Sequence, residues 1–319
     1  MITQYRSTPV GLQEIPLDLN EQGTWIRIIG TDRESDELVA QGLNLPMDLL
    51  RAAFDEEERS RIEIDDGVIL IIINTPLHLG EDKYDTLPLG LIITGGILIT
   101  VSLEENEILN HFVRNNIKSF NTGKPTRFIF QILHKTISLY LKMLSHITRR
   151  TDEIENELSV SMQNRELFQM LQLGKSLIYF ENSLRGNQIV TEKLIRLRLN
   201  TQVSLIPKYE EDEDILEDVV IETRQALEMV QMYSAILNGM TDAFASIISN
   251  NVNIVMKFLT LITVVLSVPT MVASFWGMNV NVPWGAQPGG SPMGFWIVLG
   301  LALMLSLILL FTFWKKRSL

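Results

Sequence analysis

Residues 254–276 have the sequence IVMKFLTLITVVLSVPTMVASFW, and this apolar stretch decides the fold. Its one charged residue, Lys257, lies close to its beginning. At about 1.5 Å of rise per residue, a helix of this length crosses the roughly 30 Å hydrocarbon layer of a bilayer. A second stretch of spanning length, FWIVLGLALMLSLILLFTFW at 295–314, carries Trp296 and Trp314 near its ends, as interfacial anchors do. The sequence therefore predicts two transmembrane helices.

Basic residues next to the two spans predict how the chain crosses the membrane. Lys257 flanks the first span on its amino-terminal side, and Lys315, Lys316 and Arg317 follow the second span as a basic cytoplasmic ring. Positive residues favour the cytoplasmic side of a membrane. We therefore expect a multi-pass protein of the plasma membrane, with both termini in the cytoplasm and only the loop 277–294 outside.

The overall composition excludes several classes of function. The chain has 319 residues and a formal net charge of -11, with 27 basic residues, 38 acidic residues and no cysteine. Thiolate metal sites and disulfides are excluded, and the basic residues form no stripe that would bind nucleic acid. The sequence contains no phosphate-binding loop, nucleophile elbow or HExxH motif, so we expect neither an enzyme nor a bound cofactor.

The amino-terminal part contains apolar runs of strand length. VILIIIN occupies 68–74 and LGLIITGGILITVS occupies 89–102. Gly95 and Gly96 divide the second run, and a glycine pair supplies the positive φ angles of a tight hairpin. The pattern predicts a cytoplasmic α/β domain over 1–125.

Helical periodicity follows this domain. Residues 126–207 are predicted to form an amphipathic hairpin of long helices, which ends in an acidic run at 206–218. Apolar residues then recur at steps near 3.5, which is typical of a coiled-coil-like helix. We expect one stalk helix over 208–276 that continues into the first span. The remaining segments are the loop, the second span over 295–314 and a basic tail over 315–319.

Polar residues in the first span follow a single helical stripe. The polar stripe consists of Asn253, Thr260, Thr263, Ser267, Thr270 and Ser274. Their spacings of seven, three, four, three and four place them on one face of a helix. Two interpretations are open, because hydroxyl residues line hydrated paths and also occur where membrane helices pack.

Other features of the spans favour a path for ions. The second span carries only Ser306 and Thr312 as hydroxyl residues, so it is expected to face lipid. Pro269 lies inside the first span, where its missing N–H predicts a helix kink. Two helices cannot enclose a water-filled passage, so transport requires several copies of the chain.

The tripeptide Gly277-Met278-Asn279 at the end of the first span resembles the GMN signature of the CorA magnesium transporters. The stalk, the Pro269-Thr270 pair and the basic tail fit that family as well. The resemblance implies a homopentameric channel with an α/β cytoplasmic domain, a stalk helix and two carboxyl-terminal spans. The GMN loops would form a selectivity filter for hydrated Mg²⁺, an ion that dehydrates reluctantly and prefers oxygen ligands.

The resemblance also implies roles for individual residues. Together with the polar stripe, it predicts a pore lined by Asn253, Met256, Leu259, Thr260, Thr263, Ser267, Thr270 and Ser274. Met256 and Leu259 would form an apolar constriction, although ordinary helix packing accounts for them equally well. Asp218 matches a position at which family members bind regulatory Mg²⁺ between neighbouring cytoplasmic domains. Ala52 stands where a partner acid is expected, and Asp55, Glu56 or the acidic run could substitute.

Two alternatives remain. Family members commonly follow GMN with a Met-Pro-Glu element, whereas 280–293 contains no acid. A Gly- and Pro-rich loop without acids also resembles the ZntB branch, which favours Zn²⁺, or Co²⁺ or Ni²⁺, as the alternative cargo. The second alternative is a membrane-anchored sensor or scaffold that transports nothing.

Overall fold

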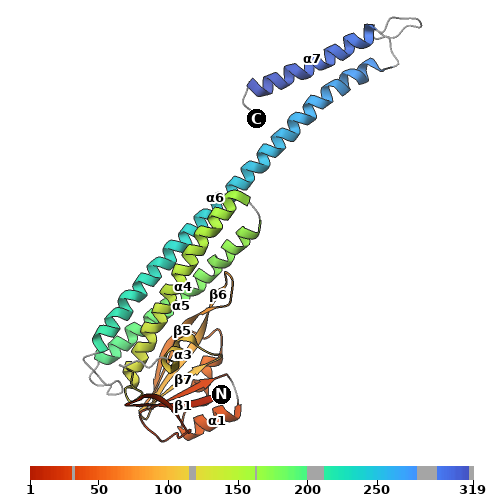
Figure 1. Cartoon of the computed structure of the whole chain (residues 1–319). Helices are drawn as coiled ribbons and strands as arrows, with labels where there is room; N and C mark the ends of the chain where they lie inside the picture. Colours follow the sequence, from red (N-terminus) through yellow and green to blue (C-terminus); the bar gives the residue numbers. More distant parts are fainter. Residues whose placement is uncertain (31–32, 115–119, 162–163, 200–211, 279–292, 316–319) are drawn as a thin grey trace. The chain divides into compact units, whose positions relative to one another are not determined.

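The computed structural model of the protein describes residues 1–30, 33–114, 120–161, 164–199, 212–278 and 293–315. The chain divides into two compact units, Met1–Met240 and Thr241–Leu319 (Figure 1). The boundary between the units does not coincide with any segment boundary predicted from the sequence, because it falls inside one long helix.

The first unit is built on a sheet of seven strands. In chain order the strands are β1 (Ile2–Thr8), β2 (Gly11–Ile15), β3 (Thr24–Ile29), β4 (Arg61–Asp65), β5 (Val68–His78), β6 (Tyr84–Thr94) and β7 (Ile97–Ser102). Their order across the sheet is β2-β1-β3-β7-β6-β5-β4. The pairing of β3 with β7 is parallel, and the other pairings are antiparallel.

The hairpin predicted at the glycine pair is confirmed. Thr94 of β6 pairs with Ile97 of β7, so the turn has two residues. Gly95 and Gly96 have φ angles of 54° and 80°. Two successive positive φ angles match the turn that suits the twist of a hairpin.

Helices cover both faces of the sheet. On one face, Ile26, Leu70 and Ile99 are buried with Val39 of α1 (Arg33–Gly42) and Leu50 of α2 (Met47–Arg51). A short 3-10 helix, η1, follows at Ala52–Phe54.

The opposite face of the sheet packs on the longer helices α3 (Glu107–Arg114), α4 (Pro125–Ser161) and α5 (Asn164–Leu199). Trp25 of β3 is fully buried there, and its ring lies edge-on to Phe128 of α4 with centroids 4.9 Å apart. The predicted α/β fold class is confirmed.

A buried amide fixes α5 against the sheet. Asn187 is 2% exposed, and its side chain bonds both backbone groups of Asn74 in β5, accepting from the N–H at 2.9 Å and donating to the carbonyl at 2.7 Å. It also accepts a bond from the Ser60 hydroxyl at 2.9 Å. Because such bonds need defined geometry, they set the position of the helix along the strand.

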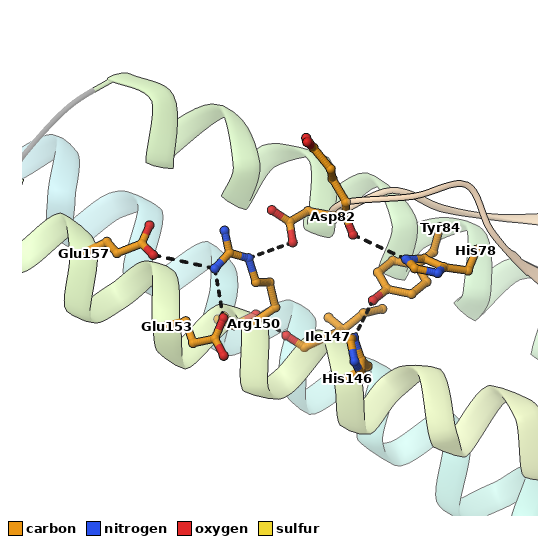
Figure 2. Close-up of polar contacts among 10 residues, drawn as sticks. His78, Asp82, Tyr84, His146, Ile147, Arg150, Glu153 and Glu157 are labelled. Atoms are coloured by element: carbon orange, nitrogen blue, oxygen red, sulfur yellow. Dashed lines mark hydrogen bonds and ion pairs between the residues drawn. The ribbon is translucent and has the colours of Figure 1, made fainter.

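An arginine on α4 holds the turn between β5 and β6 (Figure 2). Arg150 Nε donates to the buried Asp82 carboxylate at 2.8 Å, and its Nη1 donates to Glu153 at 2.9 Å. The hydrogen bond to Asp82, followed by that to Glu153, raises the pKa of the Arg150 guanidinium. Close by, the Tyr84 hydroxyl lies 3.1 Å from Nδ1 of His146. Burial, and secondarily Asp82, raises the pKa of the Tyr84 phenol.

The long helix α6 covers Asp212–Trp276. It begins inside the predicted acidic run, with Asp212, Glu213 and Asp214 in its first turn. Acidic side chains stabilise a helix amino terminus, where the peptide dipoles leave partial positive charge. The helix is continuous through Pro269, and the kink stays a prediction.

The second unit consists of the carboxyl-terminal part of α6 and of α7 (Met293–Lys315). Both helices are long and apolar enough to cross a membrane, and within the single chain only 6% and 11% of their most apolar windows are buried. Surface of this kind requires lipid or further protein around it.

The contact between α6 and α7 is narrow and well defined. Leu261 of α6 and Ala302 and Ser306 of α7 are buried there. The Ser306 hydroxyl lies 3.0 Å from the Ala302 carbonyl and 3.5 Å from the Val265 carbonyl. Pro269 has no N–H to offer to Val265, four residues earlier, so Ser306 of the partner helix approaches the carbonyl that proline leaves available.

We predict that Arg150→Met lowers the free energy of unfolding of the first unit by about 1–3 kcal/mol, because it leaves the buried Asp82 carboxylate without its cation. Arg149→Met is the matched control, since Arg149 is exposed on the same helix. Denaturant unfolding of the purified full-length protein measures both. Equal stability of the two variants would contradict the assigned role of Arg150.

Candidate functional site

The residues predicted to line a pore lie on the surface of the single chain. In α6 the exposed members are Asn253, Met256, Leu259, Thr260, Thr263, Ser267, Thr270 and Ser274. The residues of α6 nearest to α7, Leu261 and Val265, point to roughly the opposite side of the helix at 3.6 residues per turn. Packing against α7 of the same chain therefore does not account for the polar stripe.

Four hydroxyl protons of the polar stripe are already used by the backbone. Four side chains donate to carbonyls of the preceding turn, from Thr260 to Met256 (2.8 Å), Thr263 to Leu259 (2.8 Å), Ser267 to Val264 (3.0 Å) and Thr270 to Leu266 (3.0 Å). Each oxygen keeps its acceptor lone pairs. The waters around a cation direct their hydrogens outward, so a row of acceptors is the complement of a hydrated cation.

Met256 and Leu259 interrupt the polar stripe with apolar surface. Their side chains are 54% and 55% exposed in the single chain. Met256 lies four residues before Thr260 and Leu259 lies directly before it, so both border the polar stripe on α6. When copies of α6 surround a common axis, their Met256 and Leu259 side chains form an apolar ring next to the rings formed by the polar stripe.

The end of α6 carries the first two residues of the GMN motif. The Gly277 N–H donates to the Ala273 carbonyl at 2.9 Å, and a Cβ at residue 277 would lie only 3.2 Å from that oxygen. Glycine therefore fits this closing turn best. Met278 is 52% exposed.

Three predicted site residues, Asn279, Lys316 and Arg317, lie outside the described residues. Lys315 ends α7 and is exposed.

Asp218, the predicted regulatory residue, lines a cavity of about 270 Å³ in the first unit. The other lining residues are His111, Phe112, Gln131, His134, Lys135 and Ile215. Asp218 is the single carboxylate among these described lining residues, and Ala52, Asp55 and Glu56 do not belong to the set. Within one chain these acids do not line the cavity beside Asp218, and a contact with acids of a neighbouring copy stays a prediction.

The cavity instead contains basic and titratable groups that the sequence pattern did not reveal. Burial lowers the pKa of His111, Lys135 lowers it further, and Glu107 opposes both effects. His134 Nε2 lies 3.8 Å from a Glu222 carboxylate oxygen. Because α3, α4 and α6 each contribute to this cavity, no local spacing in the sequence could indicate it. A lysine beside Asp218 also opposes the binding of a cation there.

Comparisons with known proteins agree with the fold and the spans. Residues 20–317 match the profile of the family described as CorA-like Mg2+ transporter protein. The chain is 28% identical over 298 residues to the cobalt/magnesium transport protein CorA of Methanocaldococcus jannaschii, which covers 90% of this chain and 88% of the relative.

Solved structures show the same architecture. The complete structure of the CorA magnesium transporter from Methanocaldococcus jannaschii has a TM-score of 0.78 at 23% identity, covering 98% of this chain and 97% of that one. The ZntB cytoplasmic domain from Vibrio parahaemolyticus has a TM-score of 0.55 at 15% identity, covering 79% of this chain and 97% of the domain. Since the family match extends over nearly the whole chain, including both apolar helices, the chain belongs to the CorA-like Mg2+ transporter family, whose members are membrane transporters of divalent cations and not enzymes.

Proposed function

We propose that the protein takes up Mg²⁺ through a central pore that α6 from several copies of the chain lines. One observation carries the proposal: the polar stripe is exposed, is turned away from α7 and presents oxygen lone pairs. Lipid supplies no hydrogen-bond donors to the free lone pairs of such a stripe, whereas water and hydrated ions do. Neutral oxygens attract a hydrated cation without holding it tightly, which conduction requires.

The pore is proposed to be a homopentamer. A single chain supplies one polar stripe and cannot surround a passage, and the resemblance to the CorA transporters implies five copies. The helix α7 forms the outer ring against lipid, consistent with its apolar, largely exposed surface. The partners of the chain are thus further copies of itself, lipid and the cation.

Selection and gating are assigned to the two ends of the polar stripe. Gly277, Met278 and Asn279 form the outer filter, where amide and carbonyl oxygens accept the water shell of the ion. Met256 and Leu259 form the constriction, which closes by excluding water from an apolar ring. The filter loop has no acid over 280–293, so electrostatic enrichment of cations at the mouth is weak.

The basic residues orient the protein in the plasma membrane. Lys257 on one side of the first span and Lys315, Lys316 and Arg317 after the second place both termini in the cytoplasm. The functional segments are the domain 1–125, the helical hairpin 126–207, the stalk and first span 208–276, the outer loop 277–294, the second span 295–314 and the tail 315–319.

The chemistry of the polar stripe favours Mg²⁺ over the alternative cargo Zn²⁺. Residues 253–274 contain neither histidine nor cysteine, the ligands that Zn²⁺ prefers, and they offer oxygen instead. The relative from Methanocaldococcus jannaschii is named for cobalt and magnesium, and the fold of the ZntB cytoplasmic domain is similar. Zn²⁺, Co²⁺ and Ni²⁺ therefore remain the cargoes to compare.

Regulation by cytoplasmic Mg²⁺ at Asp218 is a separate part of the proposal. Asp218 borders a cavity, which supports a binding role, but Lys135 borders the same cavity. A second copy of the chain would have to supply further oxygen ligands before a divalent cation is held there.

Replacing Thr270 by leucine tests the pore. We predict that Thr270→Leu lowers Mg²⁺ flux into liposomes about tenfold or more, equivalent to a barrier increase of ~1.4 kcal/mol, because each copy adds apolar bulk to the path. Thr312→Leu on α7 makes the same chemical change on an exposed residue outside the polar stripe and should leave flux unchanged. A scaffold that transports nothing would show no Mg²⁺ flux in any of these proteins.

The cargo is tested by flux of Mg²⁺, Zn²⁺, Co²⁺ and Ni²⁺ through the purified protein in liposomes, with and without an imposed pH gradient. We expect Mg²⁺ to permeate without a proton gradient, since the polar stripe contains no titratable side chain. Flux of Zn²⁺ that excludes Mg²⁺ would reverse the assignment of the cargo and retain the pore.

The regulatory role of Asp218 is tested separately. Asp218→Ala should reduce the inhibition of flux by Mg²⁺ on the cytoplasmic side, while flux at low internal Mg²⁺ stays normal. Glu14→Ala, on exposed strand β2, removes the same charge elsewhere. If internal Mg²⁺ inhibits the Asp218→Ala protein as strongly as the parent protein, Asp218 has no such role.

A further inference from the structure

The face of α7 that meets α6 carries small residues. Ala302 and Ser306 are 6% and 7% exposed, and they lie four residues apart on one side of α7. Small side chains let two membrane helices approach closely, so that a side chain of one helix reaches the backbone of the other. Ser306 is such a side chain, because its hydroxyl lies 3.5 Å from the Val265 carbonyl of α6.

Pro269 leaves that carbonyl without its usual donor. In a regular α-helix each carbonyl accepts a hydrogen bond from the N–H four residues later, and proline has no N–H. The helix α6 nevertheless continues through Pro269 to Trp276. Inside a bilayer, a carbonyl in this position needs a donor from a side chain, from a neighbouring helix or from water.

Hydroxyl groups supply donors to the turn that precedes the proline. Within α6, Ser267 and Thr270 donate to the carbonyls of Val264 and Leu266, each at 3.0 Å. The Val265 carbonyl lies between these two acceptors in the chain, and the hydroxyl that approaches it comes from α7. One contact between the helices therefore completes a set of three hydroxyl–carbonyl contacts in this turn.

The Ser306 hydroxyl has one proton and two carbonyls within reach. The Ala302 carbonyl, at 3.0 Å, also accepts from the backbone N–H of Ser306, as in any α-helix. The Val265 carbonyl has no N–H four residues later, so the hydroxyl proton satisfies a greater need there. A small rotation of the side chain or a slight approach of α7 brings the 3.5 Å contact into the ordinary hydrogen-bond range of about 2.7–2.8 Å.

The contact lies behind the polar stripe. Val265 is on the side of α6 that faces α7, whereas Ser267 and Thr270 follow within five residues on the polar stripe. A membrane helix bends most easily at a proline, because a backbone hydrogen bond is missing there. A donor at the Val265 carbonyl therefore restrains the positions of both hydroxyl residues.

We propose that Ser306 is a positioning residue for transport. Its hydroxyl donates to the Val265 carbonyl in place of the missing N–H of Pro269. This bond holds the wall of the path at Ser267 and Thr270. The role in transport rests on the proposed function, in which α6 lines the path, but the hydrogen bond itself does not, and the two are tested separately.

Solid-state NMR of the full-length protein in lipid bilayers tests the hydrogen bond. Valine directly precedes leucine at two places in the sequence, Val265-Leu266 and Val298-Leu299. Carbonyl-¹³C valine combined with ¹⁵N leucine therefore gives two correlated carbonyl signals, and Val298, inside α7, serves as the internal reference. We expect Ser306→Ala to move the Val265 carbonyl to lower chemical shift, as the loss of a hydrogen-bond donor does, and to leave Val298 in place.

A second substitution separates this bond from the packing of α7. Pro269→Ala restores the N–H that reaches Val265, so Ser306→Ala in that background should leave the Val265 signal unchanged. A loss of packing alone would shift the signal equally in both backgrounds. Thr312→Val removes a hydroxyl that donates to the Leu309 carbonyl of its own helix at 2.8 Å, and it should move neither signal. An unchanged Val265 signal in Ser306→Ala, or equal shifts with and without the proline, would overturn the proposal.

Mg²⁺ flux into liposomes tests the role in transport. Ser306→Ala should lower the flux about fivefold, the scale of one hydrogen bond, and Thr312→Val should leave it unchanged. In the Pro269→Ala background, removing the Ser306 hydroxyl should change the flux by less than about twofold, because the restored N–H takes its place. Undiminished flux in Ser306→Ala would overturn the positioning role. A parent protein that carries no Mg²⁺ would contradict the proposed function, and the Val265 signal would still decide the hydrogen bond.

Discussion

The structure of the second unit depends on one constraint: inside a bilayer, polar groups must find partners within the protein or in a water-filled space. The hydroxyl groups of Thr260, Thr263 and Thr270 meet this constraint through the carbonyls of their own helix. Ser306 approaches the Val265 carbonyl, to which Pro269 can offer no N–H. What remains on α6 is a row of oxygen acceptors, and that surface is the chemical basis of the proposed path.

In the first unit, the long helices are held at a defined position along the sheet. Buried apolar contacts such as that of Trp25 with Phe128 supply most of the driving force, but they are not directional. Directional contacts from Asn187 and Arg150 then select one arrangement of α5 and α4. The helix α6 begins in this unit and ends at Trp276, directly before Gly277 of the GMN motif. A single helix therefore belongs to both units.

The polar stripe and the cavity at Asp218 offer a cation different surroundings. The polar stripe of α6 is neutral, which suits an ion that must leave as readily as it arrives. The cavity at Asp218 combines a carboxylate with Lys135 and two histidines, and within one chain it is less favourable for a divalent cation than the polar stripe.

The sequence by itself determined the features that depend on neighbours along the chain. Long apolar runs indicated the two spans, the Gly95-Gly96 pair indicated the hairpin, and the GMN motif in its setting indicated the family. It left open whether the polar stripe packs against α7, and it did not indicate the surroundings of Asp218. Only the tertiary structure decided these points, because each depends on side chains from elements far apart in the chain, and periodicity reports which residues share a face but not what that face meets.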